Sequence, residues 1–122
     1  LSQEFCTLAF AQGMNVGEHA ALVLRALSSE QKWTEKGEVY LVVHGLDMDG
    51  AMVTSLRLWR FDEEDLAAGA TCIIRGLKVV LETHWDGWKY VPRLDGPKTF
   101  ECTSRTAVED VSHVPAINSL FS

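Results

Sequence analysis

The stretch "SLRLWRFDEEDL", residues 55–66, decides the interpretation of this chain. Side chains alternate across a β-strand, so Leu56 and Leu58 point to one side and Arg57 and Trp59 to the other. If the leucines fill a core, Arg57 and Trp59 lie on the outer face, where another segment covers them or they contact a partner. The alternative places Trp59 in the core and the leucines outside.

The segments around this stretch predict an all-β protein. Residues 38–46, "EVYLVVHGL", are rich in β-branched and aromatic residues, and Asp49-Gly50 is typical of a hairpin turn before the strand at 51–61. Residues 15–29 also fit helical spacing, and we assign them to a strand because the later strands need a partner. Between them, residues 29–37 read as a polar loop with Trp33 at its centre.

The second half of the chain completes the pattern. Asp62 can cap a short helix over 62–69, and two further strands are expected at 70–82, with a bulge or bend at Gly76, and at 99–111. The loop between them, residues 83–98, holds Asp86-Gly87, which suits turns or a small hairpin. Five strands with a short helix between the third and fourth suit a small closed or partly open barrel, the OB fold, here as a single domain over residues 1–122.

Composition and motifs exclude several classes of protein. The chain has 122 residues and a net charge of −6, which argues against binding of nucleic acid through bulk charge alone. Its three cysteines form no CxxC pair, its histidines show no paired ligand spacing, and no nucleophile, phosphate-loop or dinucleotide motif occurs. We therefore expect no enzyme activity, no metal and no cofactor. No apolar run reaches the roughly 18 residues that span a bilayer, so no membrane association is expected.

Aromatic and basic residues gather where an OB fold binds its ligands. These regions are strands two and three and the loops joining strands one to two and four to five. Flat rings stack on bases while cations contact phosphates, so this mixture is typical of single-stranded nucleic acid binders. The candidate binding residues are Trp33, Arg57, Trp59, Arg75, Lys78, Trp85, Trp88, Lys89, Tyr90 and Arg93.

The segment "GAMVTSLRLWRFDEEDLAAGATCIIRGLKVV", residues 50–80, resembles the OB-fold DNA-binding domains of the large subunit of replication protein A. The shared elements are the Leu58-Trp59 step, the acidic run 62–65 and the sequence Gly-Leu-Lys-Val at 76–79. The tail 104–121 is similar to that family's closing strand and its proline-led exit into a helix. The resemblance implies that Trp59 stacks on a base, and it places a second stacking ring on either Trp85 or Trp88.

The resemblance implies a nuclear module of a longer chain or complex that binds single-stranded DNA in replication, repair, recombination or telomere maintenance. Its further partners would be other OB-fold subunits or replication and recombination proteins. The alternative is an OB-fold protein-interaction module with little affinity for nucleic acid, which the acidic balance favours. RNA and oligosaccharides are ligands that this fold also accepts.

Overall fold

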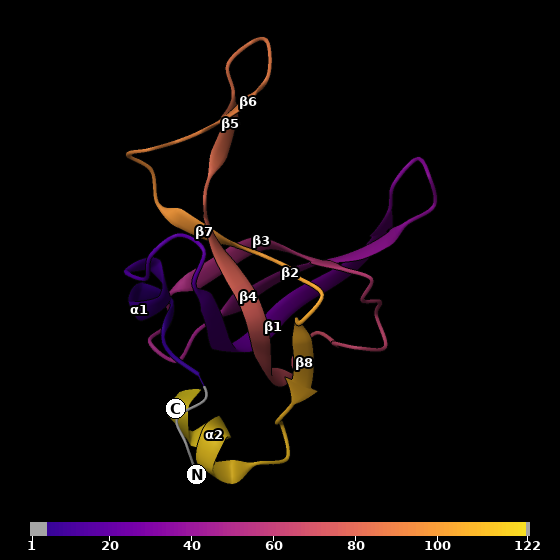
Figure 1. Cartoon of the computed structure of the whole chain (residues 1–122). Coiled ribbons are helices and arrows are strands. Elements are labelled where there is room, and N and C mark those ends of the chain that lie inside the picture. Colours follow the sequence, from indigo (N-terminus) through magenta and orange to yellow (C-terminus); the bar gives the residue numbers. More distant parts are fainter. Residues whose placement is uncertain (1–4, 122) are drawn as a thin grey trace.

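The computed structural model describes residues 5–121 and is mostly β, as the sequence predicts (Figure 1). The prediction of one domain over 1–122 includes residues 1–4 and 122, which lie outside the described part. Within that part, no helix is long and apolar enough to cross a membrane. The elements are α1 (Leu8–Gln12), β1 (His19–Trp33), β2 (Val39–Leu46), β3 (Met52–Trp59), β4 (Thr71–Leu81), β5 (Thr83–Trp85), β6 (Tyr90–Pro92), β7 (Lys98–Glu101), β8 (Ala107–Asp110), α2 (Pro115–Asn118) and the 3-10 helix η1 (Ser119–Phe121).

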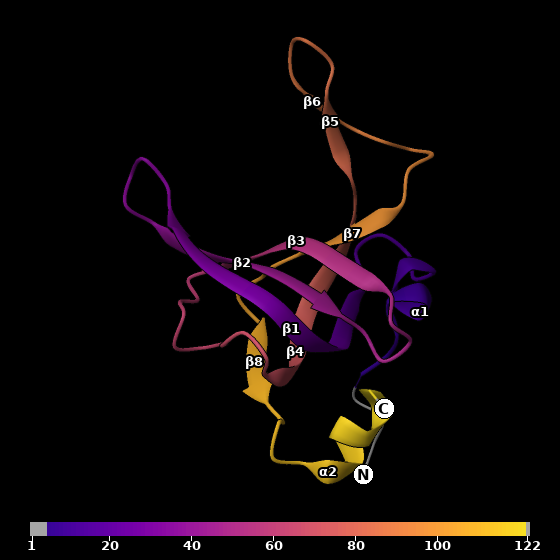
Figure 2. The same ribbon diagram turned by 180° about the vertical axis from the view of Figure 1, so that it is seen from behind.

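The main sheet is antiparallel throughout, with strand order β3-β2-β1-β4-β7, and β8 also pairs with β4. Strands β5 and β6 form a separate hairpin that projects from the end of β4 (Figures 1 and 2). This confirms the small hairpin expected within residues 83–98.

Strand β1 confirms the strand assignment of its segment but continues further than expected. It runs to Trp33, which pairs with Val39, so the prediction that Trp33 lies at the centre of a loop is wrong. The connection between β1 and β2 is a short turn that two hydrogen bonds between Thr34 and Glu38 hold closed. The Thr34 N–H donates to the Glu38 carbonyl, and the Thr34 hydroxyl accepts from the Glu38 N–H.

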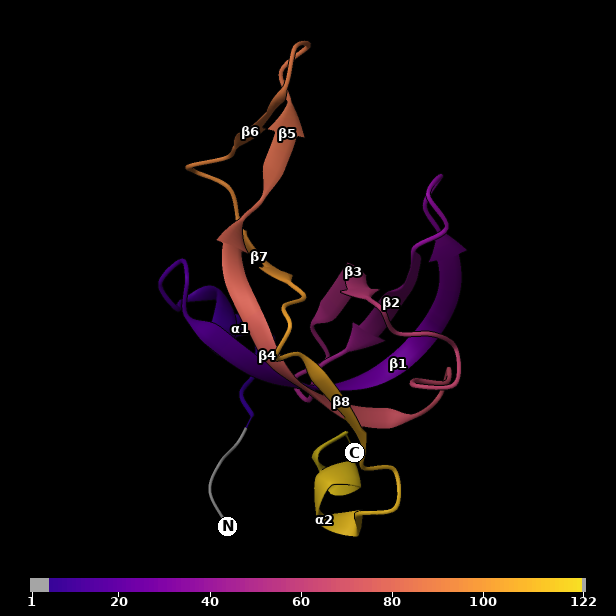
Figure 3. The same cartoon turned by 45° about the vertical axis from the view of Figure 1, so that its right-hand side comes forward.

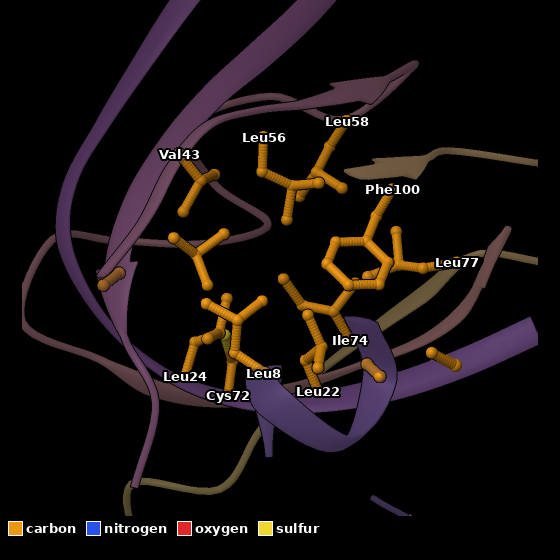
Figure 4. Close-up of a cluster of buried hydrophobic side chains, with 14 of the residues drawn as sticks. Leu8, Leu22, Leu24, Val43, Leu56, Leu58, Cys72, Ile74, Leu77 and Phe100 are labelled. Carbon is orange, nitrogen blue, oxygen red and sulfur yellow. The ribbon is translucent and has the colours of Figure 1, made fainter. Parts of the chain in front are cut away.

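The main core fills the inside of the curled sheet, and the register of β3 confirms the expected alternation. Leu56 and Leu58 are buried and Arg57 is exposed. Figure 4 shows Leu56, Leu58 and Phe100 turned into one cluster with apolar side chains of β1, β4 and α1. Cys72 belongs to this cluster, and burial, with a smaller effect of Asp110, raises the pKa of its thiol to about 12. Arg57 and Trp59 therefore face outward.

A second, smaller cluster lies on the outer side of β1 and β4, where Val23 and Ile73 are covered by the C-terminal segment. The exit into a helix after the last strand is confirmed by α2 (Figure 3). Arg25 holds this segment in place, because its guanidinium donates to the Asn118 side chain at 3.4 Å and lies 4.8 Å from the Phe121 ring centroid.

The helix predicted over 62–69 is wrong, because turns connect β3 to β4. The Asp62 carboxylate accepts from the Glu64 N–H, and the Asp65 carboxylate accepts from the Asp62 N–H. Such local side-chain bonds compete with helical ones, and so short a helix is marginal without strong packing. Leu66 alone of this segment is buried, which pins the connection to the core.

The predicted barrel is not closed, and the predicted strand at 99–111 is two strands. Within the described chain, β3 and β7 are edges that form no ladder with each other. The last strand breaks because Gly76, at φ +72°, bends β4, and its carbonyl accepts from the hydroxyls of Thr103 and Thr106. β7 therefore pairs with the second half of β4 and β8 with the first half, which leaves β7 too short to close against β3. The bend expected at Gly76 is thus confirmed.

Candidate nucleic-acid face and cleft

Two rows of side chains cross the outer face of β1, β2 and β3. Residues paired across a sheet share a face, so Lys32, Tyr40 and Trp59 form one row. Glu30, Val42 and Arg57 form the next row. We call these six residues the outer face.

The Tyr40 and Trp59 rings of this face contact each other directly. Their centroids lie 4.6 Å apart and their planes are tilted by 34°, and both side chains are partly exposed. Ring pairs at this separation stabilise each other beyond their buried area, which fixes the orientation of the exposed ring surface. Arg57 adjoins the pair, is exposed, and forms no ion pair with any described residue. A rigid aromatic surface with a free cation beside it can stack on a planar group and contact an anion.

The β5–β6 hairpin carries a second aromatic pair, Trp85 and Tyr90, which meet edge to face with centroids 5.1 Å apart. The Asp86 carboxylate shapes its turn by accepting from the Lys89 and Trp88 N–H groups, both at 2.8 Å. These two bonds, Lys89 first, hold the pKa of Asp86 below its ordinary value. Trp88 lies at the tip of this turn, 83% exposed.

A cleft separates β3 from β7, and its two adjoining parts have volumes of about 910 and 520 Å³. Arg57 lines both parts. Tyr90 lines the larger part and Trp59 the smaller part. The formal charges in it cancel, because the side chains that line it include the cations Arg57 and Lys98 and the anions Glu82 and Glu101. Figure 3 shows β3 and β7 on facing sides of the curled sheet.

The structure does not bring all the candidate residues together. The register places Trp33 on the same face as Leu41 and Leu58, opposite Trp59. Arg75 lies on the outer side of β4 and pairs with Glu109 at 2.6 Å.

Four other candidates also lie apart from the cleft. Lys78 is exposed on β4, opposite Glu101 of β7. Trp88 and Lys89 lie in the hairpin turn, and Arg93 follows β6; none of these four lines the cleft. The candidates that line the cleft are therefore Arg57, Trp59 and Tyr90, and Trp85 joins them only through its contact with Tyr90.

No match is found when the chain is compared with protein-family models, curated proteins and solved structures. The resemblance to replication protein A therefore rests on the quoted residues and stays a prediction. In the described chain, no group of three His, Cys, Asp or Glu side chains could hold a metal ion.

Sequence reasoning missed the second aromatic ring of the outer face, Tyr40, as a site residue. Alternation in "EVYLVV" puts Tyr40 opposite the buried Leu41 and Val43, and that signal was available. What the sequence does not contain is the register that sets Tyr40 beside Trp59 and Lys32. The cleft could not be predicted from the sequence either, because it forms where the two edge strands β3 and β7 do not pair.

Proposed function

We propose that this chain is a non-enzymatic, OB-like module that binds single-stranded DNA, with bases stacked on Trp59 and on the Trp85–Tyr90 pair. The observation that carries the proposal is the contact between the partly exposed Tyr40 and Trp59 rings, with the unpaired Arg57 beside them. Each stacked base contributes about 1–3 kcal/mol, whereas the guanidinium contacts phosphate. A nuclear role in replication, repair, recombination or telomere maintenance, beside other OB-fold subunits, belongs to the same proposal.

Titration of a fluorescent oligothymidylate at low salt tests it. Trp59→Ala is expected to weaken binding about 5- to 150-fold, because one stacking surface is lost. Arg57→Ala is expected to weaken binding and to reduce its dependence on salt, because one phosphate contact is lost. Phe10→Ala is the matched control, since this exposed ring lies on α1 outside the outer face and the cleft. Unchanged affinity of Trp59→Ala, or no binding by the wild type, would exclude the proposal.

The second candidate function is a protein-interaction module. Glu82 and Glu101 favour it, because they lie in the cleft beside Arg57 and offset its charge. Oligonucleotides of any sequence would then bind weakly, and the aromatic rings would contact a protein partner.

A further inference from the structure

We propose that the cleft between β3 and β7 binds an extended peptide strand of a partner protein, which pairs with both edges and completes the sheet. The inference gives the second candidate function a definite surface, and it does not depend on binding of nucleic acid to the outer face. Four observations carry it: the backbone groups of β3, those of β7, the direction of the two strands, and the lining of the cleft.

The first edge is that of β3, whose alternate backbone groups face the cleft. In an antiparallel pair, residues that exchange hydrogen bonds alternate with residues whose N–H and C=O point away from the partner. The Arg60 N–H donates to the Val39 carbonyl, which makes this a hydrogen-bonded pair. Hydrogen-bonded pairs recur at every second residue, so Leu58 and Leu56 also bond to β2. Arg57 and Trp59 consequently point their backbone groups away from β2. The Cys102 thiol agrees with this, because it lies 3.7 Å from the Trp59 carbonyl oxygen.

The second edge is that of β7, where the same reasoning applies. Val79 of β4 uses its backbone on the opposite side, since its N–H donates to the Glu18 carbonyl and its carbonyl accepts from the Gly17 N–H. Its partner Phe100 therefore makes no ladder bond to β4, and its backbone faces the cleft. The Lys98 carbonyl faces the same way, because it accepts from the Gln12 side chain at 3.4 Å.

The two edges run in the same direction. Four antiparallel steps separate β3 from β7 in the order β3-β2-β1-β4-β7, which makes the two strands parallel to each other. They converge at the end of both strands, where Trp59 meets Cys102, and they diverge toward Met52 and Pro97. A single extended chain whose N-terminus lies at the narrow end therefore runs antiparallel to both edges, which is the better paired arrangement.

The side chains that line the cleft fit a peptide better than a polyphosphate. Its lining includes the apolar side chains of Leu8, Val53 and Phe100 among polar ones, so some side chains of an inserted strand would be buried against them. Its outer rim carries Arg57 and Glu101, which match a peptide with charges of both signs. Lys98 offers little to a phosphate, because its ammonium group already donates to the Met14 carbonyl.

A second copy of this chain is a poorer occupant. Two copies of β3 that paired edge to edge around Arg57 would set like charges opposite each other, which is destabilising. Charged side chains on an edge strand oppose self-association in this way. The occupant we assign is therefore a segment of another protein, with apolar residues at alternate positions.

The test compares two variants of Arg57 against a displayed library of nonapeptides that carry Val, Ile or Tyr at every second position. Arg57→Pro removes the N–H that faces the cleft, whereas Arg57→Ala keeps that N–H and removes the charge. Peptides enriched on the wild type should bind Arg57→Ala only a few-fold more weakly, because one charge on the rim is lost. They should bind Arg57→Pro about tenfold or more weakly than Arg57→Ala, because backbone bonds are lost as well. A ligand held through its phosphates would instead lose the same affinity in both variants, because both remove the Arg57 charge.

A second measurement covers the case in which Arg57→Pro does not fold. The enriched peptide is made again with N-methyl groups at alternate residues, which keeps its side chains and removes its donors, and both forms are titrated against the wild type. The proposal requires loss of binding on methylation in both alternate patterns, because one set of donors faces β3 and the other faces β7. It also requires protection of the Arg57 and Phe100 amides from hydrogen exchange by the unmethylated peptide.

Three results would overturn the proposal. The first is that no peptide is enriched, or that an enriched peptide binds as well in either methylated form as it does unmethylated. The second is protection of the same amides by oligothymidylate, which would assign the cleft to nucleic acid. The third is their protection by self-association at high protein concentration, which would assign the cleft to a second copy.

Discussion

At the scale of single residues, Asp47 is the polar side chain on which the region around the cleft depends. It is only 2% exposed, and its carboxylate accepts from three backbone N–H groups: Leu8 at 2.8 Å, Ala51 at 2.8 Å and Asp49 at 3.0 Å. One carboxylate thus joins the start of α1 to the β2–β3 turn. Leu8 and the first residues of β3 both line the cleft, so Asp47 positions part of that wall.

Removal of this carboxylate is expected to destabilise the protein strongly. Asp47→Ala leaves buried N–H groups without an acceptor, and the free energy of unfolding should fall by about 2–4 kcal/mol. Asp47→Asn keeps one acceptor oxygen and should lose less. Urea denaturation measures both, with Asp49→Ala as the control, because that exposed turn residue should change stability by only about 0.5 kcal/mol. Equal effects of Asp47→Ala and Asp49→Ala would refute the role given to Asp47.

At the scale of elements, Gly76 decides how β4 shares its edge between two strands. Its positive φ lets β4 bend, and its Cα hydrogen leaves room for the backbone of the turn between β7 and β8. A Cβ at this position would lie 2.6 Å from the Arg105 carbonyl oxygen, closer than real contacts allow. The split of the last predicted strand, and with it the short β7, therefore follows from this glycine.

Gly76→Ala is expected to lower the free energy of unfolding by about 2–4 kcal/mol, because backbone strain adds to a clash with backbone atoms. Gly50→Ala is the matched control. It has a similar φ of +80°, and a methyl group added there would meet open space, so strain alone should cost about 1–2 kcal/mol. Thermal or urea unfolding of both variants measures the difference. Equal losses would show that the contact with Arg105 does not matter.

Sequence patterns predicted most strands of the sheet but not the connections between them or their register. Alternation in β3 and the aromatic and β-branched run of β2 predicted those strands and the inward leucines, because burial on one face leaves a period-two signal. The helix at 62–69 failed because capping residues bond equally well to turns. The split between β7 and β8 could not be foreseen, since the approach of Arg105 to Gly76 is a tertiary contact. Register, which sets Tyr40 beside Trp59, is likewise set by partners distant in sequence.

At the scale of the whole molecule, the sheet curls until its two edge strands face each other, yet they meet at one end only. The apolar interior draws β3 and β7 together, because Leu56, Leu58 and Phe100 bury themselves in one cluster. Backbone pairing does not follow, since β7 is four residues long and β8 pairs elsewhere on β4. The molecule thus has the curvature of a barrel and the free edges of an open sheet, and the proposed peptide ligand would use this combination.

Hydrogen exchange of single amides in the free protein distinguishes an open sheet from a closed barrel. Leu56 and Leu58 direct their N–H groups at β2, so their amides should exchange slowly, in the time range of global unfolding. Arg57 and Phe100 direct theirs into the cleft, so their amides should exchange much faster although Phe100 has a buried side chain. Two-dimensional NMR after transfer to deuterated water reads all four amides at once. Slow exchange at all four would show that β3 and β7 pair in solution, which would close the barrel and leave no edge for a peptide.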